Sequence, residues 1–407
     1  MAGGIARFDD LTTGTSIVFP EHDAELLATT ADQVPDVLAQ LTEATQRGWW
    51  AFGFLAYEAA AGLNPVLAAA ISTGNSRQPA DVPLAWFGLT RHPVLGQPPA
   101  GVSIGTGTNV SASTHWSLDW SVDEYLLAFN RVKEAIAAGE TYQCNLSTTI
   151  SGHVRSSPHS FYKRLLLAQR CPYGAYLNCG DFAVVSASPE LFFEWVGDQV
   201  LTRPMKGTRP RGQTPEEDRN YAAELVSDPK ERAENIIVVD LMRNDLGTIA
   251  EAVTVPKLLV TQRYQTVWQM TSDVVATVPA DLELVDLFRA LFPSGSVTGA
   301  PKASTMRLIR ELEGRPRGLY CGAIGIVAPL NAPFRARFSV AIRTAHLHRS
   351  GCFSYGVGSG ITWSSRVDAE WAELMMKAAI LSYPPSNIGL NTAPAISPTE
   401  RATASGP

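Results

Sequence analysis

The stretch Leu191–Gly212, LFFEWVGDQVLTRPMKGTRPRG, predicts a β-hairpin followed by a basic segment. The two strand-like runs, Leu191–Val196 and Gln199–Arg203, flank Gly197-Asp198, a pair typical of a tight two-residue turn. Hairpins join antiparallel neighbours, whereas parallel neighbours need long crossover connections. The stretch therefore favours antiparallel sheets over a doubly wound parallel sheet.

Further strands are predicted along the chain from the same pattern of apolar runs and short turns. Trp49–Tyr57 is apolar and aromatic throughout and predicts a buried strand. The remaining strand predictions form two groups, a hairpin of Ala175–Asn178 with Phe182–Ser188, and a second meander of Gly322–Ala328, Arg335–His346 and Cys352–Gly358.

Helices are predicted between these strands. Val122–Ala138 has apolar residues at helical spacing and stops before a glycine. Asp228-Pro229 is a strong helix start, because Asp caps the first turn and Pro suits the first helical position. Another helix, KASTMRLIRELE, follows Pro301, and a last one is expected near Ser365, where Asp368 completes a capping-box pattern.

The composition excludes several classes of protein. The chain has 407 residues, of which 45% are hydrophobic and 18% charged, and a net charge of -6, which argues against a nucleic-acid binder. Its five cysteines are odd in number and lack Cys-x-x-Cys spacing, so neither a disulfide framework nor a zinc site is expected. Neither a secretion signal nor a membrane-spanning run is recognised, and a cytoplasmic location is expected.

Lys206 is the first candidate for chemistry. It follows a strand-like run and lies among Arg203, Arg209 and Arg211. Neighbouring cations and burial both disfavour the ammonium form, so this setting is predicted to favour a neutral, nucleophilic amine. The alternative is that the segment is a basic loop on a solvated face.

Four glutamates form a second candidate site. Glu231 and Glu234 share one face of a predicted helix, and Glu370 and Glu373 share a face of another, beside Lys377. Buried carboxylates must be paired or must bind a cation, and oxygen ligands suit Mg²⁺. The alternative is two amphipathic helices with ordinary surface glutamates.

Two further features point to an anion. The run Gly356-Val-Gly-Ser-Gly-Ile361 does not have dinucleotide-loop spacing, but its backbone N–H groups can hold an anion. Arg343 is a charge inside an apolar strand, so it either pairs internally or binds a carboxylate.

Taken together, these segments resemble the chorismate-binding enzymes. The resemblance covers nearly the whole chain and is strongest from about Glu140 to Ile380. It is carried by TYQCNL, SPELFF, RPMKGTRPRG, DPKERAENIIVVDLMRNDLG, FPSGSVTGAPK, YCGAIGIV, VAIRT, and GVGSGI followed by DAEWAELMMKA. It implies an α+β fold, with two large antiparallel sheets in a sandwich and helices outside. The expected regions are residues 1–115, similar to the N-terminal part of anthranilate synthase component I, a catalytic region at 116–384, and a disordered tail at 385–407.

The resemblance also implies roles for individual residues. Glu234 and Glu373 would ligate Mg²⁺ directly, with Glu231 and Glu370 acting through water, and the metal would hold the ring carboxylate of chorismate. Lys377 and the N–H groups of Gly358, Ser359 and Gly360 would contact that carboxylate too. Arg343, with Tyr320, would hold the enolpyruvyl carboxylate, Thr298 would line the pocket, and Glu190 would protonate the departing C4 hydroxyl.

Lys206 and Gln143 bear on the reaction that the resemblance implies. Members with lysine in the PIKGT-type motif, in which this chain has Met205 in place of the usual isoleucine, make 4-amino-4-deoxychorismate, by attack of the lysine on C2 and entry of ammonia at C4. Anthranilate synthases typically carry alanine at that position. Isochorismate-forming members place a water-activating lysine where this chain has Gln143.

Several expectations remain open from the sequence. A histidine that many relatives carry near Trp268-Gln269 is missing, so no leaving-group role for a histidine is expected. No amidotransferase region is recognised, so ammonia is expected from a glutaminase subunit or from solution. The rivals are an anthranilate synthase, an aminodeoxyisochorismate synthase, and a non-catalytic protein that binds chorismate or an amidotransferase.

Overall fold

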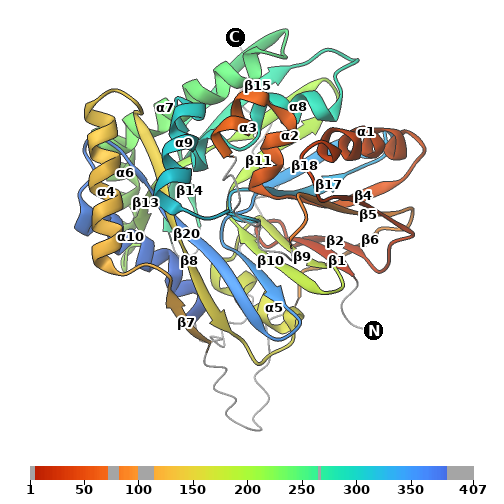
Figure 1. Cartoon of the computed structure of the whole chain (residues 1–407), viewed down its shortest axis with the longest axis horizontal. Coiled ribbons are helices and arrows are strands. Elements are labelled where there is room, and N and C mark those ends of the chain that lie inside the picture. Colours follow the sequence, from red (N-terminus) through yellow and green to blue (C-terminus); the bar gives the residue numbers. More distant parts are fainter. Residues whose placement is uncertain (1–4, 72–81, 100–113, 265–266, 383–407) are drawn as a thin grey trace.

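The computed structural model describes residues 5–71, 82–99, 114–264 and 267–382. Within these residues the strands form two ten-stranded sheets, sheet A and sheet B, whose paired strands are antiparallel (Figure 1). This confirms the predicted α+β architecture.

Sheet A runs in the order β16, β8, β20, β19, β10, β9, β1, β2, β6, with β7 beside β8. Its strands are β1 (Ala6–Asp10), β2 (Thr15–Phe19), β6 (Val94–Gly96), β7 (His115–Leu118), β8 (Gln143–His153), β9 (Tyr173–Asn178), β10 (Phe182–Ser188), β16 (Gly299–Ala300), β19 (Thr344–His348) and β20 (Cys352–Ile361).

Sheet B runs in the order β13, β15, β12, β11, β18, β17, β4, β5, β3, with β14 beside β15. Its strands are β3 (Ala24–Ala28), β4 (Trp50–Leu55), β5 (Ala85–Thr90), β11 (Leu191–Val196), β12 (Gln199–Arg203), β13 (Met205–Pro210), β14 (Ala252–Arg263), β15 (Val267–Thr277), β17 (Ala323–Val327) and β18 (Ala336–Val340).

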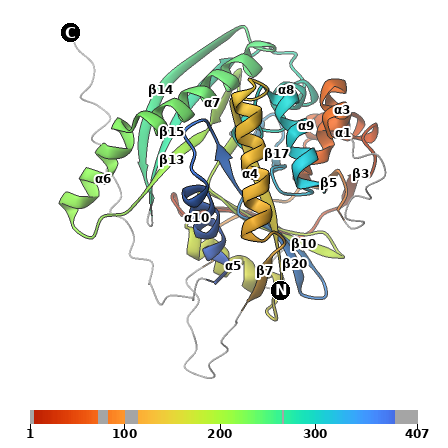
Figure 2. The ribbon, with the colours of Figure 1, turned by 60° about the vertical axis from the view of Figure 1, so that its left-hand side comes forward.

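The helices lie outside the sheets. They are α1 (Gln33–Gln46), α2 (Ala60–Leu63), α3 (Pro65–Ile71), α4 (Val122–Ala137), α5 (Pro158–Gln169), α6 (Pro215–Ser227), α7 (Pro229–Gly247), α8 (Leu284–Leu291), α9 (Lys302–Glu313) and α10 (Val367–Ala378), with short 3-10 turns at η1 (Tyr57–Ala59), η2 (Gly295–Val297) and η3 (Ala379–Ser382). The long helix α7 lies along β13, β14 and β15 of sheet B, while α10 lies on β20 of sheet A beside α4 (Figure 2).

Aromatic side chains fill one end of the space between the sheets. Phe19 of sheet A stacks on Phe52 of sheet B, with ring centroids 4.5 Å apart. Both rings are fully buried, and Phe54, Leu177 and Ile324 belong to the same cluster. Burying each phenylalanine stabilises the fold by roughly 1.5–3 kcal/mol, so this end contributes strongly to the cohesion of the sandwich.

Most element predictions are confirmed. The hairpin of β11 and β12, the hairpin of β9 and β10, and the buried strand β4 all form. The predicted start of α7 is confirmed too, since the Asp228 side chain accepts hydrogen bonds from the backbone N–H groups of Lys230 and Glu231 at 2.9 and 3.2 Å.

The predicted second meander is wrong. Arg335–His346 is not one strand, because β18 belongs to sheet B and β19 to sheet A. The chain passes between the sheets around Arg343, whose φ of 53° lies in the left-handed region. The run contains no glycine or proline that would mark this turn, and its apolar residues continue to Ile342. An arginine at positive φ is uncommon, so pattern alone could not locate the turn.

The predicted capping box at Ser365 is also wrong. Helix α10 begins at Val367, and its N-terminus has no side-chain cap. The Ser365 hydroxyl instead donates to Glu370 Oε1 at 2.7 Å and accepts from the Thr362 N–H at 3.0 Å. The serine therefore positions a carboxylate rather than capping the helix.

The N-terminal region contributes to both sheets. Strands β1, β2 and β6 pair within sheet A, and β3, β4 and β5 pair within sheet B. The region boundary near residue 115 remains a prediction. The expected tail at 385–407 lies outside the described residues.

Two passages between the sheets run side by side. The chain leaves β10 of sheet A and enters β11 of sheet B through Glu190, and it returns from β18 to β19 through Arg343. The Val340 N–H donates to Glu190 O at 3.1 Å, and the Ala187 N–H donates to Arg343 O at 3.0 Å. Two predicted site residues therefore lie at neighbouring crossings.

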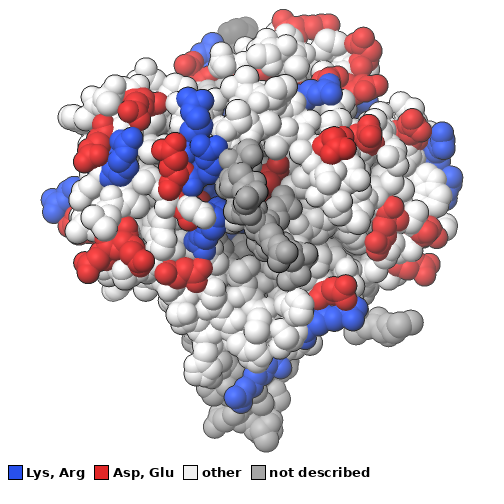
Figure 3. All heavy atoms as spheres, viewed as in Figure 1, with Lys and Arg blue, Asp and Glu red and all other residues white. Residues whose placement is uncertain are grey.

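The charged side chains on the visible surface are mixed in sign. On the face in Figure 3, basic side chains lie among acidic ones. None of the described helices has the length and apolar character needed to cross a membrane.

Candidate active site

A β-bulge places Lys206 at the other end of the inter-sheet space. Met205 pairs with Thr271 and Thr208 pairs with Gln269, so two residues of β13 oppose a single residue of β15. The second of these, Gly207, has a φ of 97°. Such bulges bend a strand and redirect its side chains. Lys206 was predicted to follow a strand. It does follow β12, and it lies in the bulge of the next strand, β13.

The Lys206 side chain reaches from sheet B to sheet A. A Cβ atom added to Gly360 of β20 would lie 2.8 Å from Lys206 Nζ and 3.5 Å from Gln143 Nε2. The predicted nucleophile, the predicted substrate-binding glutamine and the glycine-rich strand thus converge. A larger residue at position 360 would therefore displace the Lys206 ammonium group from its present position.

Gln143 is a buried polar side chain with nothing to bind. It is 1% exposed, and among the described residues neither its Nε2 nor its Oε1 atom has a hydrogen-bond partner. An unsatisfied buried polar group costs roughly 1–3 kcal/mol. The amide lies near Gly360, where Lys206 Nζ also lies, so this position suits a polar ligand.

The structure does not support the expectation that neighbouring arginines favour the neutral amine of Lys206. Each guanidinium is paired with a carboxylate: Arg203 with Asp273 at 3.0 Å, Arg209 with Asp228 at 2.7 Å and Glu231 at 3.1 Å, and Arg211 with Asp218 at 2.7 Å. Lys206 instead acts electrostatically on the carboxyl groups of Glu190, Glu234 and Glu373. The segment is not a solvated basic loop either, because Lys206 is only partly exposed.

Glu190 has the properties of an acid at neutral pH. Its side chain is buried, and its Oε1 atom accepts a hydrogen bond from Ser296 Oγ at 2.5 Å. Burial raises the pKa of Glu190 to about 7, and the opposing effects of the Ser296 hydrogen bond and of the charges of Lys206 and Lys377 are smaller. A carboxyl group of this pKa holds a proton that it can donate near neutral pH.

The four glutamates gather where α7 faces α10. Lys230 Nζ lies 3.7 Å from Glu234 Oε1 and 3.6 Å from Glu370 Oε1, which joins the two helices. Glu234 also accepts from the Thr362 hydroxyl at 3.3 Å. Glu370 is 3% exposed, so it is not an ordinary surface glutamate. Glu373 is the most open of the four, with 44% of its side chain exposed.

The electrostatics of these carboxylates differ. Burial raises the pKa values of Glu231 and Glu234, whereas the charge of Lys377 lowers that of Glu373. Among the described residues, no three acidic, histidine or cysteine side chains are close enough together to hold an ion as they stand. The donors are nevertheless the oxygen ligands that Mg²⁺ prefers, and they already surround a cation, Lys230. Their chemistry fits the ion, and the magnesium site remains a prediction.

The glycine-rich part of β20 presents a free edge. Its pairing with β19 ends at Tyr355, while its pairing with β8 continues to Ile361. Backbone N–H groups on the unpaired edge are thus open to a ligand. Lys377 Nζ donates to Gly358 O at 2.9 Å and to Glu373 Oε1 at 2.7 Å. The Ser359 hydroxyl bonds the Tyr125 hydroxyl, so only the backbone of Ser359 suits the predicted role.

Arg343 is available to an anion. Its Nη1 atom donates to Lys377 O at 2.9 Å, and within the described part of the chain no carboxylate lies within ion-pair distance. The alternative that Arg343 forms an internal ion pair is therefore not supported. Tyr320, predicted to act with Arg343, has its ring against Gly356. Thr298, predicted to line the pocket, donates its hydroxyl hydrogen to Ser294 O at 3.0 Å.

Two residues near the site were not singled out from the sequence. Ser296 binds Glu190, and Lys230 binds Glu234 and Glu370. Lys230 stands four residues before Glu234, a spacing that places both on one helix face and could have indicated the contact. Nothing in the spacing connects Ser296 with Glu190, because they are 106 positions apart.

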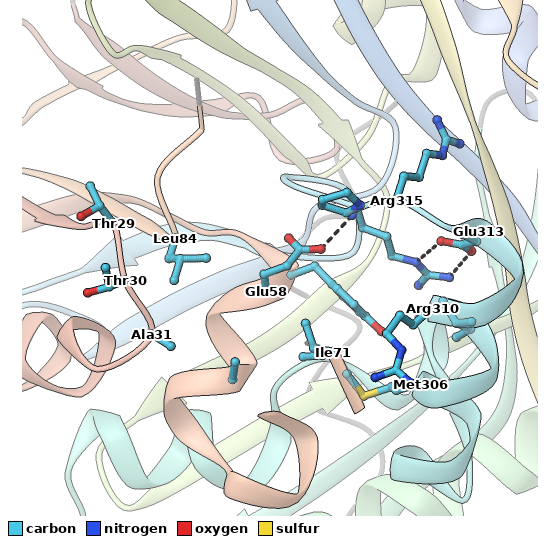
Figure 4. A pocket seen from close by; sticks show the side chains of 15 residues that line it. Thr29, Thr30, Ala31, Glu58, Ile71, Leu84, Met306, Arg310, Glu313 and Arg315 are labelled. Carbon is cyan, nitrogen blue, oxygen red and sulfur yellow. Dashed lines mark hydrogen bonds and ion pairs between the residues drawn. The ribbon is translucent and has the colours of Figure 1, made fainter. Parts of the chain in front are cut away.

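A separate cavity of about 380 Å³ lies between η1 and α9 (Figure 4). Its lining includes Glu58, Glu313 and Arg317 but none of the predicted site residues. Arg317 pairs with Glu313 at 2.7 Å and donates to Asn145 O at 2.7 Å. This buried pair is internally satisfied, and it braces the wall of β8 that carries Gln143.

Comparison with known proteins agrees with this geometry. The chorismate binding enzyme family matches residues 6–383, so the chain belongs to that family. The aminodeoxychorismate synthase component 1 of Salmonella typhimurium is 36% identical over 284 residues, which is 69% of this chain and 62% of that protein. The anthranilate synthase component 1 of Aquifex aeolicus is 35% identical over 271 residues, covering 66% and 54% of the two chains.

A solved structure confirms the fold. The anthranilate synthase component I of Streptococcus pneumoniae TIGR4 aligns with a TM-score of 0.76 and 24% identity, covering 91% of this chain and 92% of that one. The two sequence relatives are matched over less than two thirds of their length, and their names differ. Family and fold are established, and the reaction has to be argued from the site.

Proposed function

We propose that this chain is an aminodeoxychorismate synthase component I, which converts chorismate and ammonia into 4-amino-4-deoxychorismate. The observation that carries the proposal is the position of Lys206 Nζ, which lies beside Gly360 on the same side as the Gln143 amide. A lysine there suits a covalent route, and a glutamine in place of a water-activating lysine suits amination rather than hydration.

The first half of the reaction forms a bond to the protein. The neutral amine of Lys206 attacks C2 of chorismate, the two ring double bonds shift, and the C4–O bond breaks. Glu190 gives its proton to the departing hydroxyl, which leaves as water. The raised pKa of Glu190, about 7, keeps that proton available near neutral pH.

The second half releases the product. Ammonia forms a bond to C4 and gives one proton to the Glu190 carboxylate, the double bonds shift back, and the C2–N bond to Lys206 breaks. Chorismate and ammonia are thus converted into the amine and water, with the lysine restored. Splitting one difficult displacement into two steps is the advantage of covalent catalysis.

Binding of the substrate uses the charged groups around this centre. Arg343 suits the enolpyruvyl carboxylate, and the free edge of β20 with Lys377 suits the ring carboxylate. Magnesium, held by Glu234 and Glu373 directly and by Glu231 and Glu370 through water, would supply positive charge beside that carboxylate. A fixed cation and fixed donors orient the ring so that C2 faces Lys206.

The direct test is product analysis. The purified chain, chorismate, Mg²⁺ and an ammonium salt are expected to give 4-amino-4-deoxychorismate, which a separate lyase converts to 4-aminobenzoate. Anthranilate or 2-amino-2-deoxyisochorismate as the main product would overturn the proposal in favour of the anthranilate-type reaction. No product with either amine source would support a binding protein instead.

The ammonia source is part of the proposal. We propose a glutaminase subunit as the partner, in the cytoplasm, feeding 4-aminobenzoate and folate synthesis. The chain by itself is expected to use ammonium salts but not glutamine, and glutamine use is expected after a glutaminase subunit is added. Glutamine turnover by the pure chain would contradict this part alone.

A further inference from the structure

Lys230 contacts two of the four carboxylates of the proposed metal site. Its Nζ atom lies 3.7 Å from Glu234 Oε1 on its own helix and 3.6 Å from Glu370 Oε1 on α10. It is the basic group that links the two glutamate-bearing helices. No role follows for it from the resemblance to chorismate-binding enzymes or from the proposed reaction.

The other two glutamates have basic partners of their own. Glu231 pairs with Arg209 at 3.1 Å, and Glu373 pairs with Lys377 at 2.7 Å. A second lysine faces the same region from α4, because Lys133 Nζ donates to Thr362 O at 3.1 Å and to Ser365 O at 3.3 Å. The four carboxylates are thus already balanced by positive charge before any metal arrives.

A divalent cation cannot join this arrangement without conflict. It must bind Glu234, whose Oε1 atom now faces Lys230, and it must lie beside Glu370, so two positive centres sharing these carboxylates repel each other strongly at such short range. Lys230 can leave, since 38% of its side chain is exposed and its ammonium group is carried on a flexible four-carbon stem. Its backbone stays in place, because its N–H is held by Asp228 at 2.9 Å.

We propose that Lys230 is a built-in counter-cation that holds the carboxylates of α7 and α10 together in the metal-free protein and is displaced into solvent when a divalent ion binds. The proposal rests on the metal part of the proposed function. Its consequence is measurable: Lys230 competes with the ion, so the wild-type protein binds the ion less tightly than the carboxylates alone would allow.

The first experiment measures binding directly. Mn²⁺ binding is followed by electron paramagnetic resonance and Mg²⁺ binding by calorimetry, without chorismate, for wild type, Lys230→Met and Lys230→Arg. Lys230→Met is expected to bind either ion about tenfold more tightly, since one competing charge is removed. Lys230→Arg keeps the charge and is expected to bind like wild type.

The matched control removes a lysine charge elsewhere. Lys257 on β14 lies 3.6 Å from Asp273, a separation like that at Lys230, and Lys257→Met is expected to leave ion affinity unchanged. Equal affinity for Lys230→Met and wild type, or weaker binding by Lys230→Met, would overturn the proposal. A wild-type protein that binds neither ion would overturn the metal part of the proposed function, and this inference with it.

A second experiment needs no substitution in the measured protein. Lysines are reductively methylated with ¹³C formaldehyde, which keeps their charge, and the Lys230 resonance is assigned by its absence from Lys230→Gln. Addition of Mg²⁺ is expected to move this resonance towards the position of solvent-exposed lysines, while the Lys257 resonance stays in place. A Lys230 resonance that does not respond to saturating Mg²⁺ contradicts displacement, whatever the affinities are.

Discussion

The two ends of the space between the sheets are lined by side chains of opposite polarity. At one end, Phe19 and Phe52 stack across the sheets and Phe54 stacks with Trp86. At the other end, the same two sheets bring together Lys206, Gln143 and the free edge of β20. Both ends are built from antiparallel strands, but the polar end also has the β-bulge of β13 and the unpaired edge of β20.

This contrast separates stability from chemistry within one sandwich. Each buried phenylalanine stabilises the fold by roughly 1.5–3 kcal/mol. The unpartnered amide of Gln143 costs roughly 1–3 kcal/mol. The polar end is therefore tolerated because the aromatic end holds the sheets together, and substitutions at the two ends should have opposite consequences.

The largest effect is expected at Lys206. Lys206→Ala removes the proposed nucleophile, and amination at C4 is expected to fall by about 10⁴-fold, with the fold intact and some amination leaking to C2. The measurement is product analysis by chromatography and mass spectrometry. In wild type without ammonia, a mass increase is expected on the Lys206 peptide. Full C4 amination by Lys206→Ala, with no adduct in wild type, would remove Lys206 from the mechanism.

A substitution at the aromatic end is expected to lower stability instead of activity. Phe52→Ala deletes a fully buried ring from the stacked pair and is expected to lower the free energy of unfolding by about 3–5 kcal/mol. Turnover per folded molecule should change little, because Phe52 is not part of the site. Urea unfolding and activity at low temperature measure the two quantities. A collapse of turnover in fully folded protein would show that the two ends are not independent.

Glu190→Gln should show how much the buried Glu190 carboxylate lowers the stability of the folded protein. Burial raises the pKa of Glu190 to about 7, so the folded state binds its proton more tightly than the unfolded state does. That contribution to stability is present below the unfolded pKa of about 4.5 and is lost as the pH rises through about 7. The variant lacks this loss, and above pH 7 it should be more stable than wild type by about 3 kcal/mol while turning over far more slowly. Thermal unfolding from pH 5 to 8 measures the difference, which would be constant across pH if Glu190 titrated normally.

The smallest effect is expected at the helix faces. Glu234→Gln or Glu373→Gln removes a proposed direct ligand and should weaken Mg²⁺ affinity by about 100-fold, with thermal stability nearly unchanged. Calorimetric titration measures the affinity, and Glu251→Gln on a surface turn serves as the control. Wild-type affinity and wild-type turnover at limiting Mg²⁺ in both variants would show that the ion binds elsewhere.

Residue patterns predicted much of the fold and part of the site. Local spacing within one short segment was enough to predict the β11–β12 hairpin, the start of α7 and the two glutamate pairs. The crossing at Arg343 could not be predicted, because its positive φ depends on neighbouring sheets rather than on glycine. The arginines near Lys206 misled for a similar reason: their partners, such as Asp273 and Asp218, lie on other elements and cancel their charge.

The paired crossings at Glu190 and Arg343 have a consequence for how the protein matures. Gln143 belongs to one sheet and Lys206 to the other, and α10, with Glu370 and Glu373, comes near the end of the described chain. No fragment that forms a single sheet therefore contains the site. The ribosome must have synthesised the chain through α10 before a substrate molecule has all of these groups to bind.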